Sequence, residues 1–373
     1  MRRFAGDFEV LFIESLPMRS LAAVDRGELG RAWRKLRAGS RLRTPEPHLH
    51  VLSAPPIPPA GRLGEAALLT ALRAQIALAR RRLRLNGPTV TWFSVPTAAP
   101  LRSRLGERGS LFYYQDRYDQ FTGVQPQRLR ELTSQLARDC DVSIATSAEL
   151  ADDLRAFGAA PELVPHGVDA ERFAGDPDPP DDLTGLERPL IGYVGILDDY
   201  LDLDAIRAVA ERLEQGTVVL VGAANADVSA LDHPRIVRLG FRPYAEVPAY
   251  LAAFACCICP FQMSGLTTAV NPIKLREYLA AGRPVVATPL PAVLEYRDVV
   301  EVASTRDEFA AAVIRALQPD QDTADSRERR RARVRGESWD AVAARIRPFL
   351  LSLSGLADPD PRPSDLRETL QGS

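Results

Sequence analysis

Short apolar segments rich in β-branched residues alternate with helical segments along almost the whole chain. Strands this apolar, each followed by a helix, are typical of parallel sheets that are covered on both faces. The strands predicted in the first half are Val10–Glu14, His50–Ala54, Thr89–Phe93, Ser110–Tyr114, Val142–Ala145 and Glu162–Val164, with helices at Glu65–Leu85, Gln127–Asp139 and Ser147–Phe157. Those predicted in the second half are Leu190–Val194, Thr217–Val221, Ile236–Leu239, Cys256–Cys259, Pro284–Thr288 and Val299–Val302, with helices at Asp202–Glu214, Val247–Phe254, Asn271–Ala281 and Glu308–Leu317.

A segment rich in proline, glycine and aspartate, residues 174–189, divides this alternation into two series of similar size. Such a linker favours two doubly wound domains over one continuous barrel. The length of 373 residues also suits two domains. We therefore predict an α/β protein with one domain over residues 1–168, a second over 169–355 and a disordered tail over 356–373.

Composition excludes several other classes of protein. The chain is 46% hydrophobic and 26% charged, which is ordinary for a well-packed globular protein. No apolar run is long enough to span a membrane, and the first residues lack the apolar centre of a secretory signal. Three of the four cysteines, Cys256, Cys257 and Cys259, crowd one predicted strand without accompanying histidines. They predict buried thiols rather than a metal site or a disulfide framework, and hence a cytoplasmic protein.

Charge is distributed unevenly. Residues 1–110 hold 19 basic against 8 acidic side chains, a net of +11, which leaves −13 for the rest because the whole chain carries −2. A basic region indicates an anionic partner. The arginines of 31–43 and 63–85 fit either a peripheral contact with an anionic inner membrane or an ordinary solvated surface. No aromatic signature favours nucleic acid.

The segment 271–288 carries the most chemical information. Asn271 is expected to cap a helix that has Pro272 in its first turn and ends at Gly282. Lys274 and Glu277 then share one face of this helix, with Lys274 beside its N-terminus, a combination that suits a diphosphate. The same pair could instead be a surface ion pair. Lys274 is one of only two lysines among 47 basic residues. A lysine that is kept at this position is therefore better explained by a chemical requirement than by a surface ion pair, which arginine could also form.

This segment resembles the donor-nucleotide motif of GT-B glycosyltransferases, specifically the family 4 (group 1) type, whose pattern is Pro-x-Lys-x-x-Glu-Tyr-x-Ala-x-Gly-x-Pro-Val-Val. Other segments agree with that family in order and spacing: the hinge motif Val164-Pro165-His166-Gly167-Val168-Asp169, the strand and glycine loop Ile191–Gly195, and the strand ends at Gly222 and Gly240-Phe241-Arg242. The resemblance covers about residues 110–290. Within the family, the chain more closely resembles the bacterial enzymes that build teichuronic acid and exopolysaccharide. The resemblance implies two Rossmann-like domains that face a cleft.

The resemblance also implies roles for individual residues. Lys274 would neutralise the diphosphate leaving group, Glu277 would orient donor hydroxyls, and Asn271 with backbone N–H groups would add electrostatic support. Gly195, Phe241, Arg242 and Ile273 complete the expected donor site, and His166 is expected at the hinge, touching substrate or holding a structural hydrogen bond. The sequence departs from the family at Ala269, where a glutamate is usual, and after Gly195, where an arginine and a lysine are usual.

A second block, Leu111–Phe121, follows an apolar strand, and strand ends line the ligand cleft in open α/β sheets. A carboxylate there can act as general base on an acceptor hydroxyl. Asp116 comes first after the strand and is the candidate catalytic base, with Asp119 second. The alternative is a solvated loop in which Arg117 pairs with one of these aspartates.

Together these features predict a hexosyltransferase-type glycosyltransferase. It would move sugar from a nucleotide sugar, UDP-sugar favoured, to a cell-surface polysaccharide, lipid-linked or other glycan acceptor. Resemblance to the fold implies no metal and no cofactor. The alternatives are a catalytically inactive partner subunit, which the change at Ala269 would explain, or a nucleotide-sugar epimerase. Members of the fold open with a strand and a helix before the strand that Val10–Glu14 resembles. We therefore expect the first domain to lack its usual first strand. Either the natural start codon lies upstream, or this form of the chain is unstable or inactive.

Overall fold

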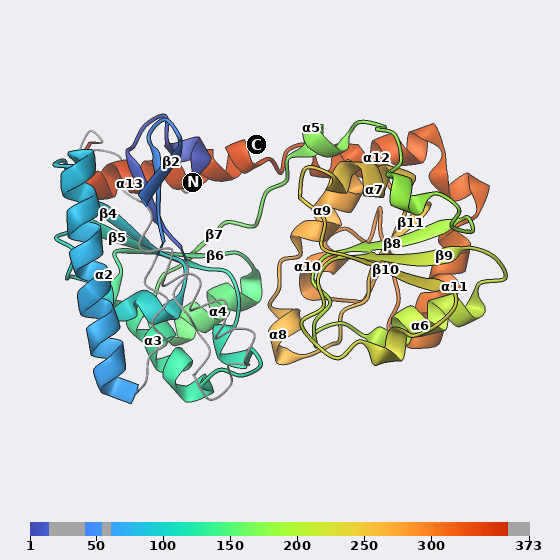
Figure 1. Cartoon of the computed structure of the whole chain (residues 1–373), viewed down its shortest axis with the longest axis horizontal. Helices are drawn as coiled ribbons and strands as arrows, with labels where there is room; N and C mark the ends of the chain where they lie inside the picture. Colours follow the sequence, from blue (N-terminus) through green and yellow to red (C-terminus); the bar gives the residue numbers. More distant parts are fainter. Residues whose placement is uncertain (15–41, 54–60, 357–373) are drawn as a thin grey trace. The chain divides into compact units, whose positions relative to one another are not determined.

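The computed structural model describes residues 1–14, 42–53 and 61–356, which form two compact units (Figure 1). The first unit comprises Met1–Val164 and the chain from Ala343 onward, and the second comprises Pro165–Val342. The first boundary lies four residues before the predicted one. The predicted second domain is wrong at its end, because residues 343–355 belong to the first unit.

The last helix, α13 (Trp339–Ser354), explains this correction. The Arg347 guanidinium contacts the Asp7 carboxylate at 2.7 Å, and Arg345 donates a hydrogen bond of 2.6 Å to the carbonyl of Leu163. Leu353 packs so closely against Gly109 that a Cβ there would lie 2.8 Å from the leucine Cβ. Helical periodicity predicts the helix but does not specify what its apolar face covers.

The second unit is built on a six-stranded sheet that is parallel throughout, in the order β10-β9-β8-β11-β12-β13. Its strands are β8 (Leu190–Val194), β9 (Thr217–Val221), β10 (Ile236–Gly240), β11 (Cys256–Cys259), β12 (Val285–Ala287) and β13 (Glu301–Val302). Its helices are α5 (Ala170–Phe173), α6 (Leu203–Arg212), α7 (Val247–Ala253), α8 (Gly265–Thr268), α9 (Ile273–Ala280), α10 (Pro291–Leu294), α11 (Arg306–Ala316) and α12 (Ala324–Val334). The order reverses between β8 and β11, and this switch point is where doubly wound sheets bind ligands.

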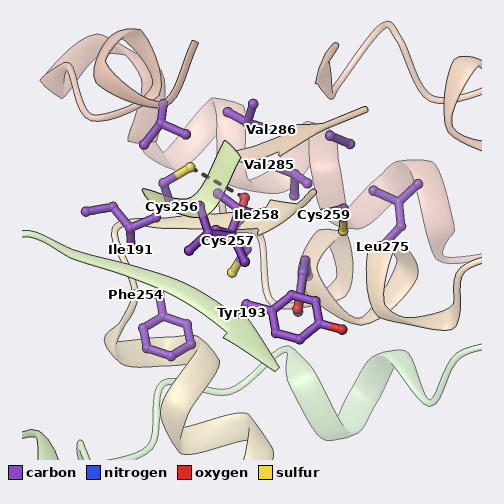
Figure 2. Packing of buried hydrophobic residues seen from close by; sticks show 14 of the residues in the cluster. Ile191, Tyr193, Phe254, Cys256, Cys257, Ile258, Cys259, Leu275, Val285 and Val286 are labelled. Carbon is purple, nitrogen blue, oxygen red and sulfur yellow. Dashed lines mark hydrogen bonds between the residues drawn. The ribbon is translucent and has the colours of Figure 1, made fainter. Parts of the chain in front are cut away.

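The core of the second unit is the apolar layer around β8, β9 and β11, whose residues are almost completely buried. Cys256, Cys257 and Cys259 have no measurable exposure and carry no disulfide. Figure 2 shows their thiols packed among aliphatic and aromatic side chains, including Ile191 and Phe254. The prediction of buried thiols is therefore confirmed. Burial raises the pKa of the Cys259 thiol to about 12.

The first unit has two sheets, with strand orders β1-β3-β2 and β4-β5-β6-β7. Its strands are β1 (Val10–Ile13), β2 (Leu42–Glu46), β3 (Leu49–Leu52), β4 (Val90–Phe93), β5 (Gly109–Tyr114), β6 (Val142–Ala145) and β7 (Glu162–Leu163). Its helices are α2 (Gly61–Leu83), α3 (Pro126–Asp139), α4 (Ala148–Ala156) and part of α13. All strand pairs are parallel except β2 with β3. The sequence analysis missed β2, because Thr44-Pro45-Glu46 has a weak strand pattern.

Candidate active site

Three glycine loops meet at the carboxyl ends of neighbouring strands in the second unit. The Gly195 N–H, after β8, donates to the carbonyl of Val221 at 2.8 Å, and the Gly222 N–H, after β9, donates to the carbonyl of Gly240 at 2.8 Å. Gly195 and Gly222 have φ angles of +153° and +154°, a conformation that side chains disfavour. A Cβ on Gly222 would lie 1.8 Å from the carbonyl oxygen of Gly195. Glycine at both positions therefore allows the two loops to touch.

Lys274 reaches this glycine loop from α9. A Cβ on Gly195 would lie 1.8 Å from Cε and 2.6 Å from Nζ of Lys274, so the ammonium lies directly against the loop backbone. Its Nζ is also 5.7 Å from the centre of the Tyr193 ring, a cation–π distance. The structure thus brings together two predicted site residues that are 79 positions apart in the sequence. A cation, a helix N-terminus and loop N–H groups suit an anionic ligand.

Glu277 lies one turn further along α9 and is only 7% exposed. Its Oε1 accepts a hydrogen bond of 2.8 Å from the hydroxyl of Tyr244, a residue that the sequence analysis missed. Burial raises the pKa of Glu277, and the Tyr244 hydrogen bond with the nearby Lys274 and Arg172 charges opposes that rise. The Tyr244 ring lies under the Arg172 guanidinium at 5.1 Å. No motif signals Tyr244, because its partner is 33 residues away.

Asn271 does not cap α9, so that expectation is wrong. The residue before the helix is Pro272, and no side chain caps the helix there. The Asn271 Oδ1 instead accepts hydrogen bonds from Arg276 Nη1 at 2.7 Å and from the backbone N–H of His166 at 3.3 Å. Arg276 is 1% exposed and also contacts Glu337 at 2.7 Å. These contacts fix the start of α9 against the hinge motif, and so position the Lys274 turn.

His166 takes part in this buried network and its side chain lies beside Trp339, with ring centres 5.9 Å apart. Burial, with a smaller contribution from the Arg276 charge, lowers the pKa of its imidazole to about 4, so the ring is neutral at physiological pH. The neighbouring Gly167 leaves no room for a side chain, since a Cβ there would be 2.7 Å from the backbone nitrogen of Trp339. Of its two expected roles, the described contacts of His166 support the structural one.

The remaining donor-site candidates lie around these loops. Ile273 is half-buried in the first turn of α9. Phe241 follows β10 and is 72% exposed. Arg242 is instead held by Asp182, at 2.8 Å, and by the Tyr250 hydroxyl, at 2.9 Å. This ion pair and hydrogen bond connect the Arg242 side chain to Asp182 and to Tyr250 of α7.

Asp116 and Asp119 lie after β5 in the first unit. Asp119 is in a short 3-10 helix, Tyr118–Gln120, and Asp116 accepts a backbone bond from Tyr118. Arg117 is bound to Asp153 on α4, with Nε–Oδ2 and Nη2–Oδ1 distances of 2.7 and 3.0 Å. The Arg117 guanidinium therefore has a partner on α4, which neither of the pairings considered from the sequence included.

The described part of the chain holds no group of three or more His, Cys, Asp or Glu side chains placed to bind a metal ion. It also contains no helix long and apolar enough to cross a membrane. Among the described side chains, Arg73, Arg81 and Arg82 of α2 are exposed, and so is Arg84, which directly follows that helix. Residues 31–41 of the second predicted basic segment lie outside the described residues.

Solved structures with the same architecture define the fold. Sucrose-phosphate synthase from Thermosynechococcus elongatus aligns over 93% of this chain and 99% of its own, with a TM-score of 0.68 and 16% identity. Anabaena HepE, in complex with UDP and glucose, aligns over 92% of this chain and all of its own, with a TM-score of 0.64 and 17% identity. The chain therefore has the GT-B fold, with two α/β units.

The sequence of the second unit resembles one known family. Residues 188–319 match the sequence model of the group 1 glycosyl transferases. TuaH of Bacillus subtilis, assigned to teichuronic acid biosynthesis as a glycosyltransferase, is 32% identical over 198 residues. That alignment covers 50% of this chain and 49% of TuaH, so the chain spans about half the length of this curated relative.

Proposed function

We propose that the protein is a glycosyltransferase that moves a sugar from a UDP-sugar to a glycan or lipid-linked acceptor of a surface polysaccharide. The contact between Lys274 and the Gly195 loop carries this proposal, because it places a cation and the start of α9 beside a glycine loop at the switch point of the sheet. The group 1 family match and the UDP complexes of HepE support it. They also favour an active transferase over an inactive subunit.

In this proposal the second unit binds the donor. The diphosphate would lie against Lys274, the Gly195 loop and the start of α9, and the sugar hydroxyls would reach Glu277. A bond would form between the acceptor oxygen and the anomeric carbon, while the bond from that carbon to the UDP oxygen breaks. Lys274 and the start of α9 would stabilise the charge that develops on UDP, so we propose that no metal or cofactor is needed.

Lys274→Met tests the donor assignment. Removing the ammonium should weaken UDP binding by about 1.5–3 kcal/mol, the range of a charge-assisted hydrogen bond, or roughly 10- to 150-fold. Isothermal titration calorimetry with UDP measures this change. Arg212→Met, which removes an exposed cation from α6, is the matched control and should bind UDP like the wild type. Wild-type affinity in Lys274→Met would refute the donor site.

Transfer itself is tested separately. A panel of nucleotide sugars is screened for those that raise the melting temperature, since a ligand at concentration [L] stabilises by RT ln(1 + [L]/Kd). The stabilising donors are then incubated with lipid-linked and oligosaccharide acceptors, and release of UDP is measured. A donor that binds but is turned over with none of these acceptors would favour the inactive-subunit alternative.

We further propose a cytoplasmic location with peripheral contact to an anionic membrane. The exposed arginines of α2 support this, because clustered arginines attract anionic headgroups. Such a contact would bring the protein to a lipid-linked acceptor.

A further inference from the structure

A cavity of about 570 Å³ lies in the first unit, and none of the candidate donor-site or catalytic residues lines it. All of β1 and all of β4 line this cavity. Leu72 and Ile76 of α2 line it, and Leu350 and Ser354 of α13 line it as well. Strand edges from two different sheets therefore face one apolar space that helices also border.

The two strands are edges with backbone groups to offer. Among the described residues, β1 pairs with β3 alone and β4 pairs with β5 alone. The N–H groups of Val10 and Glu14 donate to β3, so by the alternation of a parallel ladder those of Leu11 and Ile13 point the other way, toward the cavity.

The same argument applies to β4. The carbonyl of Thr89 accepts from Arg108 on the β5 side. Residues 89, 91 and 93 therefore face β5, and the backbone groups of Val90 and Trp92 face the cavity. Each of the two strands thus offers the N–H and C=O groups of two alternate residues, which is the spacing at which a neighbouring β-strand pairs.

The exposure of the strands identifies what is missing between them. β5, one strand further from the cavity, is buried along its whole length, as are β9 and β11 in the second unit. In β1 no residue is buried, and Phe12 is 42% exposed; in β4 only Phe93 is buried. The indole N–H of Trp92 is buried and has no hydrogen-bond partner among the described residues. These apolar strands have the composition of interior strands without the burial of interior strands.

We propose that this space, the β1–β4 slot, binds one extended apolar peptide segment as an additional β-strand. Backbone groups of the peptide would pair with Leu11 and Ile13 on one side and with Val90 and Trp92 on the other. Its side chains would pack toward α2 on one face and α13 on the other, so apolar residues are required on both. This mode of binding is β-strand addition, in which main-chain hydrogen bonds give affinity and the flanking surfaces give selectivity.

The experiment uses the full 373-residue chain and a synthetic peptide, acetyl-Lys-Lys-Val-Ile-Val-Ile-Val-Lys-Lys-amide. Hydrogen exchange is followed residue by residue. The peptide should slow exchange at least tenfold at the amides of Leu11, Ile13, Val90 and Trp92. The amides of Val10, Phe12 and Thr91, which already face β3 or β5, are internal controls and should change little. The same peptide with proline at its central position should protect none of them.

Val90→Pro supplies the matched variant, since it removes one slot-facing N–H and leaves the bonds to β5 in place. It should melt near the wild-type temperature and bind the peptide at least tenfold more weakly. If it fails to fold, N-methylation of alternate peptide residues tests the same bonds on the wild-type chain. Any of three results would overturn the proposal. The proline peptide could bind as tightly as the original peptide, or the peptide could protect the control amides as strongly as the slot-facing amides. The slot-facing amides could also be protected from exchange before any peptide is added.

Discussion

Lys274 and Glu277 are one turn apart on α9, yet the structure gives them different surroundings. Lys274 lies against the backbone of the Gly195 loop, whereas Glu277 is buried and accepts a hydrogen bond from the Tyr244 hydroxyl. A buried carboxylate with a single neutral donor is costly to ionise. A buried carboxylate with this cost is typical of a ligand-binding site, where a group of the ligand supplies the partner that the protein lacks.

Glu277→Gln should therefore raise stability and lower activity. The raised pKa of Glu277 means that the folded chain holds this proton more tightly than the unfolded chain, whose ordinary value is 4.5. Protonation thus favours folding below about pH 4.5, and that contribution is lost as the pH rises through the raised pKa. The amide variant cannot ionise, so it should be the more stable protein at pH 7.5 and similar to the wild type near pH 4. Urea unfolding at the two pH values measures the difference.

Tyr244→Phe is the companion variant. It removes the hydrogen bond that favours the ionised carboxylate and should enlarge the pH dependence. If Glu277→Gln is less stable than the wild type at pH 7.5, the carboxylate is satisfied in the unliganded chain and this account of its burial is wrong.

Asp116→Asn examines the base assigned in the first unit. The amide keeps the size of the side chain but cannot accept the acceptor proton, so turnover should fall by about 10²–10⁴ while UDP affinity stays near the wild-type value. Initial rates and calorimetry on the same preparation separate the two. Asp119→Asn is the control; a large loss there and none in Asp116→Asn would transfer the role to Asp119.

At the scale of elements, the glycine loops decide whether the strand ends can meet. Gly195 and Gly158 both have positive φ, but only Gly195 has neighbours within 4 Å of a Cβ. Alanine at either position should cost about 1–2 kcal/mol through the backbone. Only Gly195→Ala should displace Lys274 and so weaken UDP binding roughly tenfold or more. Thermal melting and calorimetry on both variants test this, and equal UDP affinity in both would contradict it.

The order and type of most elements could be predicted from the sequence, because β9 and β11 are buried on both faces and therefore read as unbroken apolar runs. What could not be predicted depends on distant partners. Arg242 follows a strand end, as a ligand-binding residue should, but no local pattern signals that Asp182, sixty residues earlier, contacts its side chain. Asn271 precedes a helix, as a cap should, but Arg276 and His166 take its oxygen. A local sequence pattern predicts the element on which a residue lies, but it does not predict which distant residue its side chain contacts.

At the scale of the whole molecule, the basic charge of residues 1–110 gives the first unit a long-range preference that the rest of the chain lacks. Exchange of Arg81, Arg82 and Arg84 for glutamine should lower affinity for phosphatidylglycerol vesicles by about 3 kcal/mol, at about 1 kcal/mol per charge. Wild-type binding should weaken with added salt. Sedimentation with vesicles measures both effects.

The matched control replaces three exposed arginines elsewhere, Arg212, Arg297 and Arg329, by glutamine, and its vesicle binding should stay near that of the wild type. Equal binding to neutral and anionic vesicles would show that headgroup charge has no part in it.

The packing of β11 has a practical consequence for following how the protein opens. Thiols react as thiolates, and the three cysteines of β11 are both inaccessible and hard to ionise. Cys140 is half-buried in the first unit. A thiol reagent therefore labels the second unit only when the centre of its sheet separates, while Cys140 reports on the first. The native cysteines thus act as built-in reporters of local unfolding, one set for each half of the chain.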